Sequence, residues 1–572
     1  MTFALQFGKF AARFAIVWFC YGLTQTLSAS ECEKHAAKAL SIQGQVEMRS
    51  DGESAWIPVH QNMDLCPGDR LRVGEKSRAG LMLSNDTLLR LAEHSNIRIS
   101  APAQEGSAWL ELMRGIAHFI SRVRHTFQVD TPYVNASVEG TEFTVQTSED
   151  GSDVTVLEGR VLAANPQGEI LVNGGERARV LPGKAPEAEA VVDPLDAVQW
   201  ALYYPPVIEA LPERPSAELR RSYEAYVRGD IEGAFAALAQ SGDVEQEAAL
   251  LVYRASLHLQ VGATEAARRD LAAALRLQPE HPNGLALMSI ISTVRNERQQ
   301  AIELAQRAVA ADPQAGSPLL ALSYARQALF QLPEALEAAK KATQVAPESH
   351  LAWSRLAQLQ LMFRRLDQAL EAAGRAVEIA PDQPQALTTQ GFAQLIRFDL
   401  DGARQRFEQA AALDQADPLP RLGLGLVEIR QGDLQTGRRQ LETAASMDPG
   451  YALIRSYLGK AYYEEKRNEH AATQFALAKQ FDERDPTAWF YDAILKQSEN
   501  RPIEALRELQ TSIDLNDNRA VYRSRLLLDQ DEAARNASQA RIYQDLGFEQ
   551  LARAEAYKSL QTDAASHSAH RL

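Results

Sequence analysis

A chain of 572 residues is too long for a single hydrophobic core, so two or more domains or an extended array are expected. Its hydrophobic content of 45% excludes a disordered protein, and its net charge of −15 comes without the basic stripe that a nucleic-acid-binding surface requires. This acidic balance favours solubility and weak affinity for anionic membranes.

Residues 1–30 have the features of a secretory signal. Lys9 and Arg13 give a basic start, residues 14–23 form an apolar run, and small residues at 28–30 suit a cleavage site. We therefore expect an exported protein, with an uncleaved N-terminal anchor as the alternative. After removal of the signal, we expect no direct membrane span.

Two cysteines, Cys32 and Cys66, would remain after cleavage of the signal. One cysteine pair in an exported chain favours a disulfide that ties the new N-terminus to the first domain. The alternative is two unpaired, partly buried thiols. A metal site is not expected, because the two cysteines lie far apart and have no histidine partner in register.

Residues 31–181 follow a period of two. Ile42, Gly44, Val46 and Met48 alternate with polar residues, as expected of a half-buried strand. Several further short apolar runs follow, separated by turn sequences such as residues 66–69 and 84–87. The pattern predicts an all-β domain, either a sandwich or a rolled solenoid.

Several motifs in this domain resemble the FecR periplasmic domain. They are Gly44, Gln45 and Val46; Trp56; residues 68–72; Thr131 and Pro132; residues 140–145, which read Gly-Thr-Glu-Phe-Thr-Val; and residues 158–161. The resemblance implies a domain that docks or senses in the cell envelope. Together with the signal features, it implies a location in the periplasm or outer envelope of a Gram-negative bacterium. Members of this family also carry a membrane helix and a cytoplasmic anti-sigma segment before the domain, whereas a signal peptide precedes it here.

No catalytic, cofactor or metal-binding motif stands out. His94, His118 and His125 share no ligand-like spacing, and the acidic residues 148–153 read as a solvated hairpin tip. The sequence contains no phosphate loop, dinucleotide fingerprint or nucleophile elbow. We therefore expect no enzyme activity, no cofactor and no metal.

Residues 182–215 form a linker that contains an aromatic segment. Trp200, Tyr203 and Tyr204, followed by two prolines, are too apolar for a free linker. The segment either docks between the β domain and the region that follows it, or anchors a partner protein. Residues 216–247 then read as a degenerate repeat that caps the array.

Residues 248–519 repeat a 34-residue unit eight times. One column of small residues, which lies at this period, comprises Ala267, Ala301, Ala335, Ala369, Ala403, Gly437, Ala471 and Ala505. Each unit contains two amphipathic helical segments, and proline closes several units. The 34-residue period, the columns of small residues and the closing proline together resemble the tetratricopeptide repeat. This resemblance implies a C-terminal all-α superhelix of helix-turn-helix units.

The resemblance implies an inner groove that binds a protein segment. The residues expected to line it are Leu320, Tyr324, Leu361, Phe392, Leu395, Leu422, Leu426, Tyr463 and Phe490. These side chains predict an apolar groove for an apolar or amphipathic partner segment. Alternatively, the chain's own tail or the Trp200 segment covers part of this surface.

The register breaks after the eighth unit. Residues 520–532 read as an insertion, 533–566 as a further repeat, and 567–572 as the start of an incomplete one. The two-part architecture predicts a non-catalytic envelope scaffold that binds one or more protein partners and no nucleic acid. The alternatives are a FecR-type signal-transduction regulator and an accessory part of an envelope enzyme or outer-membrane assembly.

Overall fold

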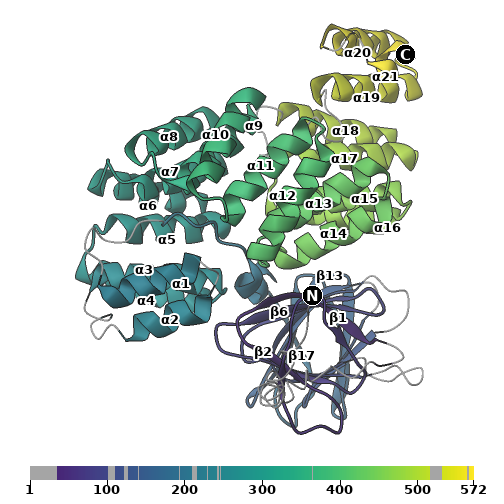
Figure 1. Ribbon diagram of the computed structural model, residues 1–572. Coiled ribbons are helices and arrows are strands. Elements are labelled where there is room, and N and C mark those ends of the chain that lie inside the picture. Colours follow the sequence, from purple (N-terminus) through teal and green to yellow (C-terminus); the bar gives the residue numbers. More distant parts are fainter. Residues whose placement is uncertain are drawn as a thin grey trace, which may run out of the picture.

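The computed structural model describes residues 32, 35–100, 110–121, 127–138, 141–191, 194–208, 216–227, 230–240, 244, 247–363, 365–515, 531–562, 564 and 566–572. The expected signal peptide at 1–30, His125, and the part of the expected insertion before residue 531 lie outside these residues. Figure 1 shows a β domain on one side of a curved helical array, whose C-terminal helices lie farthest from it.

The N-terminal domain is all-β, as the period of two predicts. Its described strands are β1 (Ala37–Gln43), β2 (Val46–Arg49), β3 (Ile57–Pro58), β4 (Asp64–Leu65), β5 (Arg70–Val73), β6 (Arg78–Leu83), β7 (Leu88–Leu91), β8 (Asn96–Ile99), β9 (Leu110–Ile120), β10 (Phe127–Asp130), β11 (Asn135–Val138), β12 (Glu142–Ser148), β13 (Gly151–Glu158), β14 (Arg160–Asn165), β15 (Gly168–Asn173), β16 (Glu176–Val180) and β17 (Glu187–Ala190). They form two sheets, ordered β4-β1-β6-β7-β9-β12-β13-β16-β17 and β3-β2-β5-β8-β9-β10-β11-β14-β15.

Strand β9 belongs to both sheets. Its first half pairs with β8 and β10, and its second half pairs with β7 and β12. Gly115 lies at the change, with φ at 104°, and a Cβ there would lie 2.4 Å from the Cα of Ser95. The rings of Phe119 and Phe143 stack at 4.9 Å in the core between the sheets.

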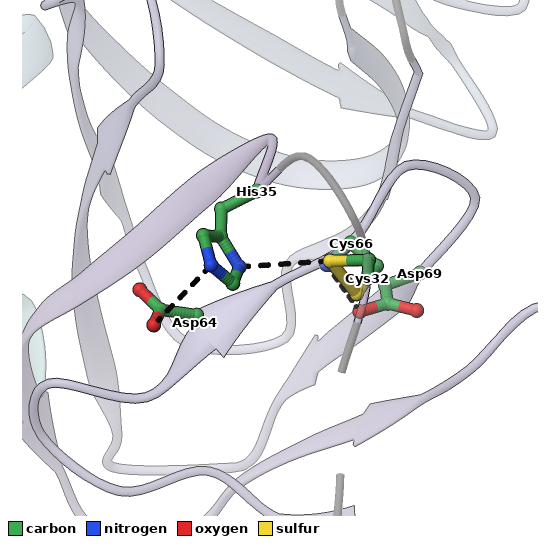
Figure 2. Close-up of a disulfide and its surroundings, with 5 residues drawn as sticks. All are labelled: Cys32, His35, Asp64, Cys66 and Asp69. Carbon is green, nitrogen blue, oxygen red and sulfur yellow. Dashed lines mark hydrogen bonds and ion pairs between the residues drawn. A yellow bond between two sulfur atoms is a disulfide. The ribbon is translucent and has the colours of Figure 1, made fainter. Parts of the chain in front are cut away.

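Cys32 and Cys66 form a disulfide, as the cysteine count predicts (Figure 2). Their Cα atoms lie 5.9 Å apart, and the bond fastens the start of the described chain to the turn before β5. The Asp69 carboxylate accepts a hydrogen bond from the Cys66 backbone N–H at 2.7 Å and fixes this turn. A bond of this kind fits an oxidising compartment.

The remaining described chain is helical, apart from the 3-10 helix η1 (Pro194–Ala201) and the connector. The helices are α1 (Ala217–Val227), α2 (Ile231–Ala239), α3 (Ala248–Gln260), α4 (Thr264–Leu277), α5 (Pro282–Val294), α6 (Arg298–Ala311), α7 (Gly316–Ala328), α8 (Leu332–Val345), α9 (His350–Met362), α10 (Leu366–Ile379), α11 (Pro384–Ile396), α12 (Leu400–Leu413), α13 (Pro418–Gln431), α14 (Leu434–Met447), α15 (Ala452–Glu464), α16 (Asn468–Phe481), α17 (Pro486–Ser498), α18 (Pro502–Asp514), α19 (Asp531–Asp545), α20 (Glu549–Thr562) and α21 (His567–His570).

Consecutive helices pack as pairs, and each 34-residue unit between residues 248 and 514 holds one pair. Ala267, Ala301 and Ala335, which stand in the column of small residues, are 0% exposed. They lie where the two helices of a unit cross closely, so a larger side chain would force the helices apart. Asp230, Asp399 and Asp433 each begin a second helix by accepting a backbone N–H bond from the residue three positions on.

Two units replace the small residue of the first helix by glycine and place phenylalanine opposite it. A Cβ on Gly391 would lie 2.7 Å from the ring of Phe407, and one on Gly459 would lie 2.5 Å from the ring of Phe475. Both rings are 0% exposed. The phenylalanine ring on the second helix therefore fills the volume that glycine leaves free on the first helix, which keeps the core packed.

Candidate binding cavity and domain interface

A fully buried ion pair joins the two domains. Arg455 on α15 donates to both carboxylate oxygens of Glu142 on β12, each at 2.6 Å, and both side chains are 0% exposed. Arg455 also donates to the Pro449 carbonyl and to Gln474 Oε1. His118 Nε2 lies 3.1 Å from Glu142 Oε1. Every oxygen and nitrogen of the pair thus has a partner, which a buried ion pair requires.

The environment keeps Glu142 ionised. Burial alone would raise the pKa of Glu142, but the charge of Arg455 and the hydrogen bonds from His118 and Arg455 hold it well below its usual range. Burial lowers the pKa of His118, against the opposing effect of Glu142. At this buried point of the interface, one matched pair of charges therefore lies beside an imidazole whose pKa is lowered.

Other polar contacts fix the β domain against distant parts of the array. Gln474 Nε2 donates to Glu158 at 3.0 Å, and Gln415 Oε1 accepts from the Ile42 backbone N–H at 2.8 Å. At the other end of the array, Arg78 on β6 donates to the carbonyl of Gln260, the last residue of α3, at 2.8 Å. The two domains therefore have a defined relative orientation (Figure 1).

The aromatic connector docks within the molecule. Arg78 donates to the Trp200 carbonyl, Gln385 Nε2 on α11 donates to the Tyr203 hydroxyl at 3.0 Å, and Tyr204 is 2% exposed. The backbone of Tyr203 also lies near the Asp448 carboxyl group and lowers its pKa, against the larger opposing effect of burial. These contacts place the connector against the inner wall of the superhelix, which agrees with the first of the two interpretations of this segment.

A cavity of about 700 Å³ lies beside the connector on the inner face of the array. Its walls are connector residues 202, 203, 205 and 206, the α5–α6 turn, the inner faces of α7, α9 and α11, and the turns that precede α13, α15 and α17. The volume falls within the range of about 300–1,000 Å³ that ligand sites occupy.

Two distant turns meet at one side of this cavity. Asn296 Nδ2 donates to the Phe481 carbonyl at 3.4 Å, and Arg298 donates to Asp482 at 3.2 Å. Arg298 and Arg484 also lie over the ring of Phe330, at 5.3 and 4.6 Å from its centroid. The superhelix thereby closes on itself between the α5–α6 turn and the α16–α17 turn.

The structure divides the predicted groove residues. Leu320 and Tyr324 line the cavity, and the Arg355 guanidinium covers the Tyr324 ring at 3.9 Å. Tyr463 is half-buried and lies outside the lining. The other predicted residues, at most 4% exposed and packed in the core, are Leu361, Phe392, Leu395, Leu422, Leu426 and Phe490.

The placement of these six residues corrects the expectation of an open apolar groove. Phe392 on α11 shows the cause, because its ring meets the Phe407 ring at 4.8 Å and α11 also packs against α9 and α13. Neighbouring first helices cover this face, so apolar side chains there stabilise the array and are not available to a partner.

Sequence reasoning missed a series of aspartates at the cavity. Asp414, Asp448 and Asp482 occupy the same position in three successive units, immediately after the second helix, and Asp417 and Asp485 begin the first helices α13 and α17. Four of these aspartates, all except Asp414, line the cavity. The sequence did contain a sign of this series. Asp414, Asp448 and Asp482 are spaced 34 residues apart, and each stands one position before the residue that closes its unit, such as Pro449.

Burial changes the titration of these carboxyl groups. It raises the pKa of Asp448 and of Asp482 to about 6 each. It raises the pKa of Asp417 well above the usual range, and the nearby charge of Asp414 adds to the effect. The Asp417 carboxylate accepts the backbone N–H of Leu419 at 2.9 Å. The cavity wall is therefore acidic, and ionising its buried carboxyl groups without a counter-charge costs free energy.

The raised pKa of Asp448 predicts a pH dependence of stability. The folded state holds this proton more tightly than the unfolded chain, so the contribution is full below pH 3.8 and is lost as the pH rises through about 6. In Asp448→Asn, the decrease in the free energy of unfolding between pH 4.5 and 7.5 should shrink by about 2 kcal/mol. Urea titrations at both pH values measure this difference, and an unchanged decrease would contradict the assignment.

Within the described residues, no helix combines the length and apolarity needed to cross a membrane. The same part of the chain contains no group of three or more His, Cys, Asp or Glu side chains placed to hold a metal ion.

Comparisons with known proteins match both parts of the chain. Residues 69–162 match the model of the FecR protein family, and residues 319–384 and 422–488 match a tetratricopeptide repeat model. No curated protein matches the sequence significantly.

Solved structures of helical-repeat proteins show limited similarity. A chain of the APC/C hetero-tetramer Cut9–Hcn1 is 17% identical, with 58% of this chain and 63% of that chain covered and a TM-score of 0.43. The human IFIT1 dimer with m7Gppp-AAAA is 13% identical over 62% and 92% of the chains, with a TM-score of 0.40. A tetratricopeptide repeat protein from Parabacteroides merdae is 16% identical over 41% and 93%, with a TM-score of 0.30. The chain spans less than two thirds of the length of the first of these.

These two domain types together indicate a regulator or a protein-interaction adaptor. Tetratricopeptide repeats imply interaction with protein partners, FecR domains are typically associated with the cell envelope, and both are typically non-catalytic. The chain is a FecR domain followed by an array of tetratricopeptide repeats.

Proposed function

We propose that this protein is a non-catalytic adaptor of the bacterial cell envelope that holds an extended segment of a partner protein inside its superhelix. The observation that carries the proposal is the cavity of about 700 Å³ on the inner wall of the array. It is lined by several repeats at once, as a surface for an extended segment must be.

The connector supports the choice of an extended protein segment. It lies on the same inner wall, where Gln385 donates a hydrogen bond to its Tyr203 hydroxyl and the Asp448 carboxyl group lies near its backbone. Polar side chains of the array thus already hold a stretch of chain in this position. The cavity continues beyond Pro205 and Pro206, and offers Tyr451 and Phe481 as further apolar contacts.

The FecR domain packs against the helical array and lies outside the cavity. The Glu142–Arg455 pair and the Gln474–Glu158 hydrogen bond hold it beside α15 and α16. In this arrangement the β domain can dock or sense on its other surfaces, while the array keeps one fixed position relative to it. The Cys32–Cys66 disulfide and the N-terminal signal features support a place in the envelope.

Site-specific photo-crosslinking in the intact bacterium tests the adaptor. A crosslinking residue at Gln358, which lines the cavity, is expected to capture a discrete protein, whereas one at the exposed Glu371 on α10 is not. Ala328→Trp should fill part of the cavity and abolish capture, whereas Ala310→Trp, an exposed alanine outside the lining, should leave capture intact. Equal capture from Gln358 and Glu371 would contradict the proposal.

A further inference from the structure

We propose that the cavity recognises a basic side chain, lysine or arginine, carried by the partner segment. This inference rests on the adaptor function proposed above and specifies the chemistry of its partner. The site consists of the carboxylates of Asp417, Asp448 and Asp485 together with the aromatic residues of the same wall.

The carboxylates line one cavity because the superhelix repeats. Asp417 and Asp485 stand at the same position two units apart, and each begins a first helix. One carboxylate oxygen of each residue accepts a hydrogen bond from the backbone N–H two residues later in the chain, at 2.9 Å. The other carboxylate oxygen of each residue can accept a hydrogen bond from a bound cation. The charges that act most on Asp417 are those of Asp414 and Asp448, both negative. A cation placed there would relieve this repulsion.

The aromatic residues suit an organic cation. Tyr324, Tyr451 and Phe481 line the same cavity. Cation–ring contacts already occur at this wall, where Arg355 covers the Tyr324 ring at 3.9 Å and Arg484 covers the Phe330 ring at 4.6 Å. Rings beside carboxylates are the environment in which ammonium and guanidinium groups bind well.

Ser354 supplies an independent observation. It lines the cavity from α9 and is 2% exposed, and its Oγ has no hydrogen-bond partner within the described residues. A buried hydroxyl without a partner is costly, unless a ligand completes it. A lysine ammonium has three donors and no acceptor, so a hydroxyl oxygen and a carboxylate are both groups to which it can donate.

Peptide binding to the purified protein tests the inference. The probes are two fluorescent peptides of equal length, one alternating leucine with lysine and the other alternating leucine with glutamate. We expect the lysine peptide to bind at least tenfold more tightly, as measured by fluorescence anisotropy. Equal affinity for the two peptides would overturn the inference.

A conservative double variant locates the site. Asp417→Asn with Asp485→Asn keeps both helix caps, because asparagine caps as well as aspartate, and it removes two charges from the cavity. It should weaken binding of the lysine peptide at least tenfold. Asp399→Asn makes the same change at an exposed helix cap outside the lining and should leave the affinity unchanged. Undiminished binding in the double variant would overturn the inference.

Two further outcomes separate this inference from the adaptor function. If spermidine alone binds as tightly as the lysine peptide, the site serves a small amine and the inference of a basic partner segment fails. If crosslinking from Gln358 captures the same protein equally well in the Asp417→Asn, Asp485→Asn variant, the adaptor stands and the basic side chain does not. Loss of Gln358 capture in the variant, with capture in the unmodified chain, supports both.

Discussion

Glu142→Gln is expected to lower the free energy of unfolding by about 3–5 kcal/mol, because it leaves the buried charge of Arg455 without its counter-charge. The glutamine has nearly the shape of the glutamate, so packing is preserved while the ion pair is lost. Both side chains are 0% exposed, and water cannot compensate for the loss. Urea denaturation followed by circular dichroism measures the change.

Two companion variants make this expectation specific. Arg455→Met combined with Glu142→Gln should recover most of the loss, because no buried charge then remains unpaired. Asp86→Asn removes an ion pair at the same interface, to Arg439 at 3.9 Å, whose side chains are 59% and 45% exposed, and it should cost less than about 1 kcal/mol. A similar loss from Asp86→Asn and Glu142→Gln would refute the role assigned to burial.

Phe407→Ala is expected to cost about 3–5 kcal/mol, the usual result of emptying a fully buried aromatic site. The ring is 0% exposed and occupies the space above Gly391, where a Cβ would lie only 2.7 Å from it. Leu413→Ala on the same helix is the control, because Leu413 is 47% exposed, and it should change stability by about 0.5 kcal/mol or less. Thermal and urea unfolding measure both variants.

The two residues should also show strong coupling. Gly391→Ala in the unmodified chain overpacks the site and should destabilise by about 1–3 kcal/mol. In the Phe407→Ala background, the same change fills part of the cavity and gains about 1 kcal/mol of helix propensity, so it should stabilise. Additive effects would show that the glycine and the ring do not share one packing site.

The parts of the fold that depend on local pattern were predictable. The 34-residue period located the helix pairs, since columns such as Ala267 and Ala301 must be small wherever two helices cross closely. The period of two identified the β domain in the same way. The Cys32–Cys66 disulfide was the favoured of the two interpretations that the cysteine count allowed.

The candidate site was only partly predictable, because it depends on which surfaces distant repeats cover. A helical period shows that Phe392 and Leu422 share an apolar face, but it does not show that neighbouring helices bury that face. Leu320 and Tyr324 line the cavity. One side of the cavity is closed by the ion pair of Arg298 and Asp482, two residues that lie far apart in sequence. Glu142 and Arg455 form an ion pair although they lie 313 positions apart, so no local pattern connects them.

The attachment of the β domain at two distant places has a mechanical consequence. In a superhelix of stacked helix pairs, each repeat contacts mainly its neighbours, so the pitch of the superhelix can change. Here Arg78 fastens the domain to the end of α3, and Glu142 fastens it to α15. The β domain thus links two distant parts of the array, and these contacts oppose a change in its pitch. Under the proposed function, the partner segment would therefore spend little binding energy on reshaping the wall that it contacts.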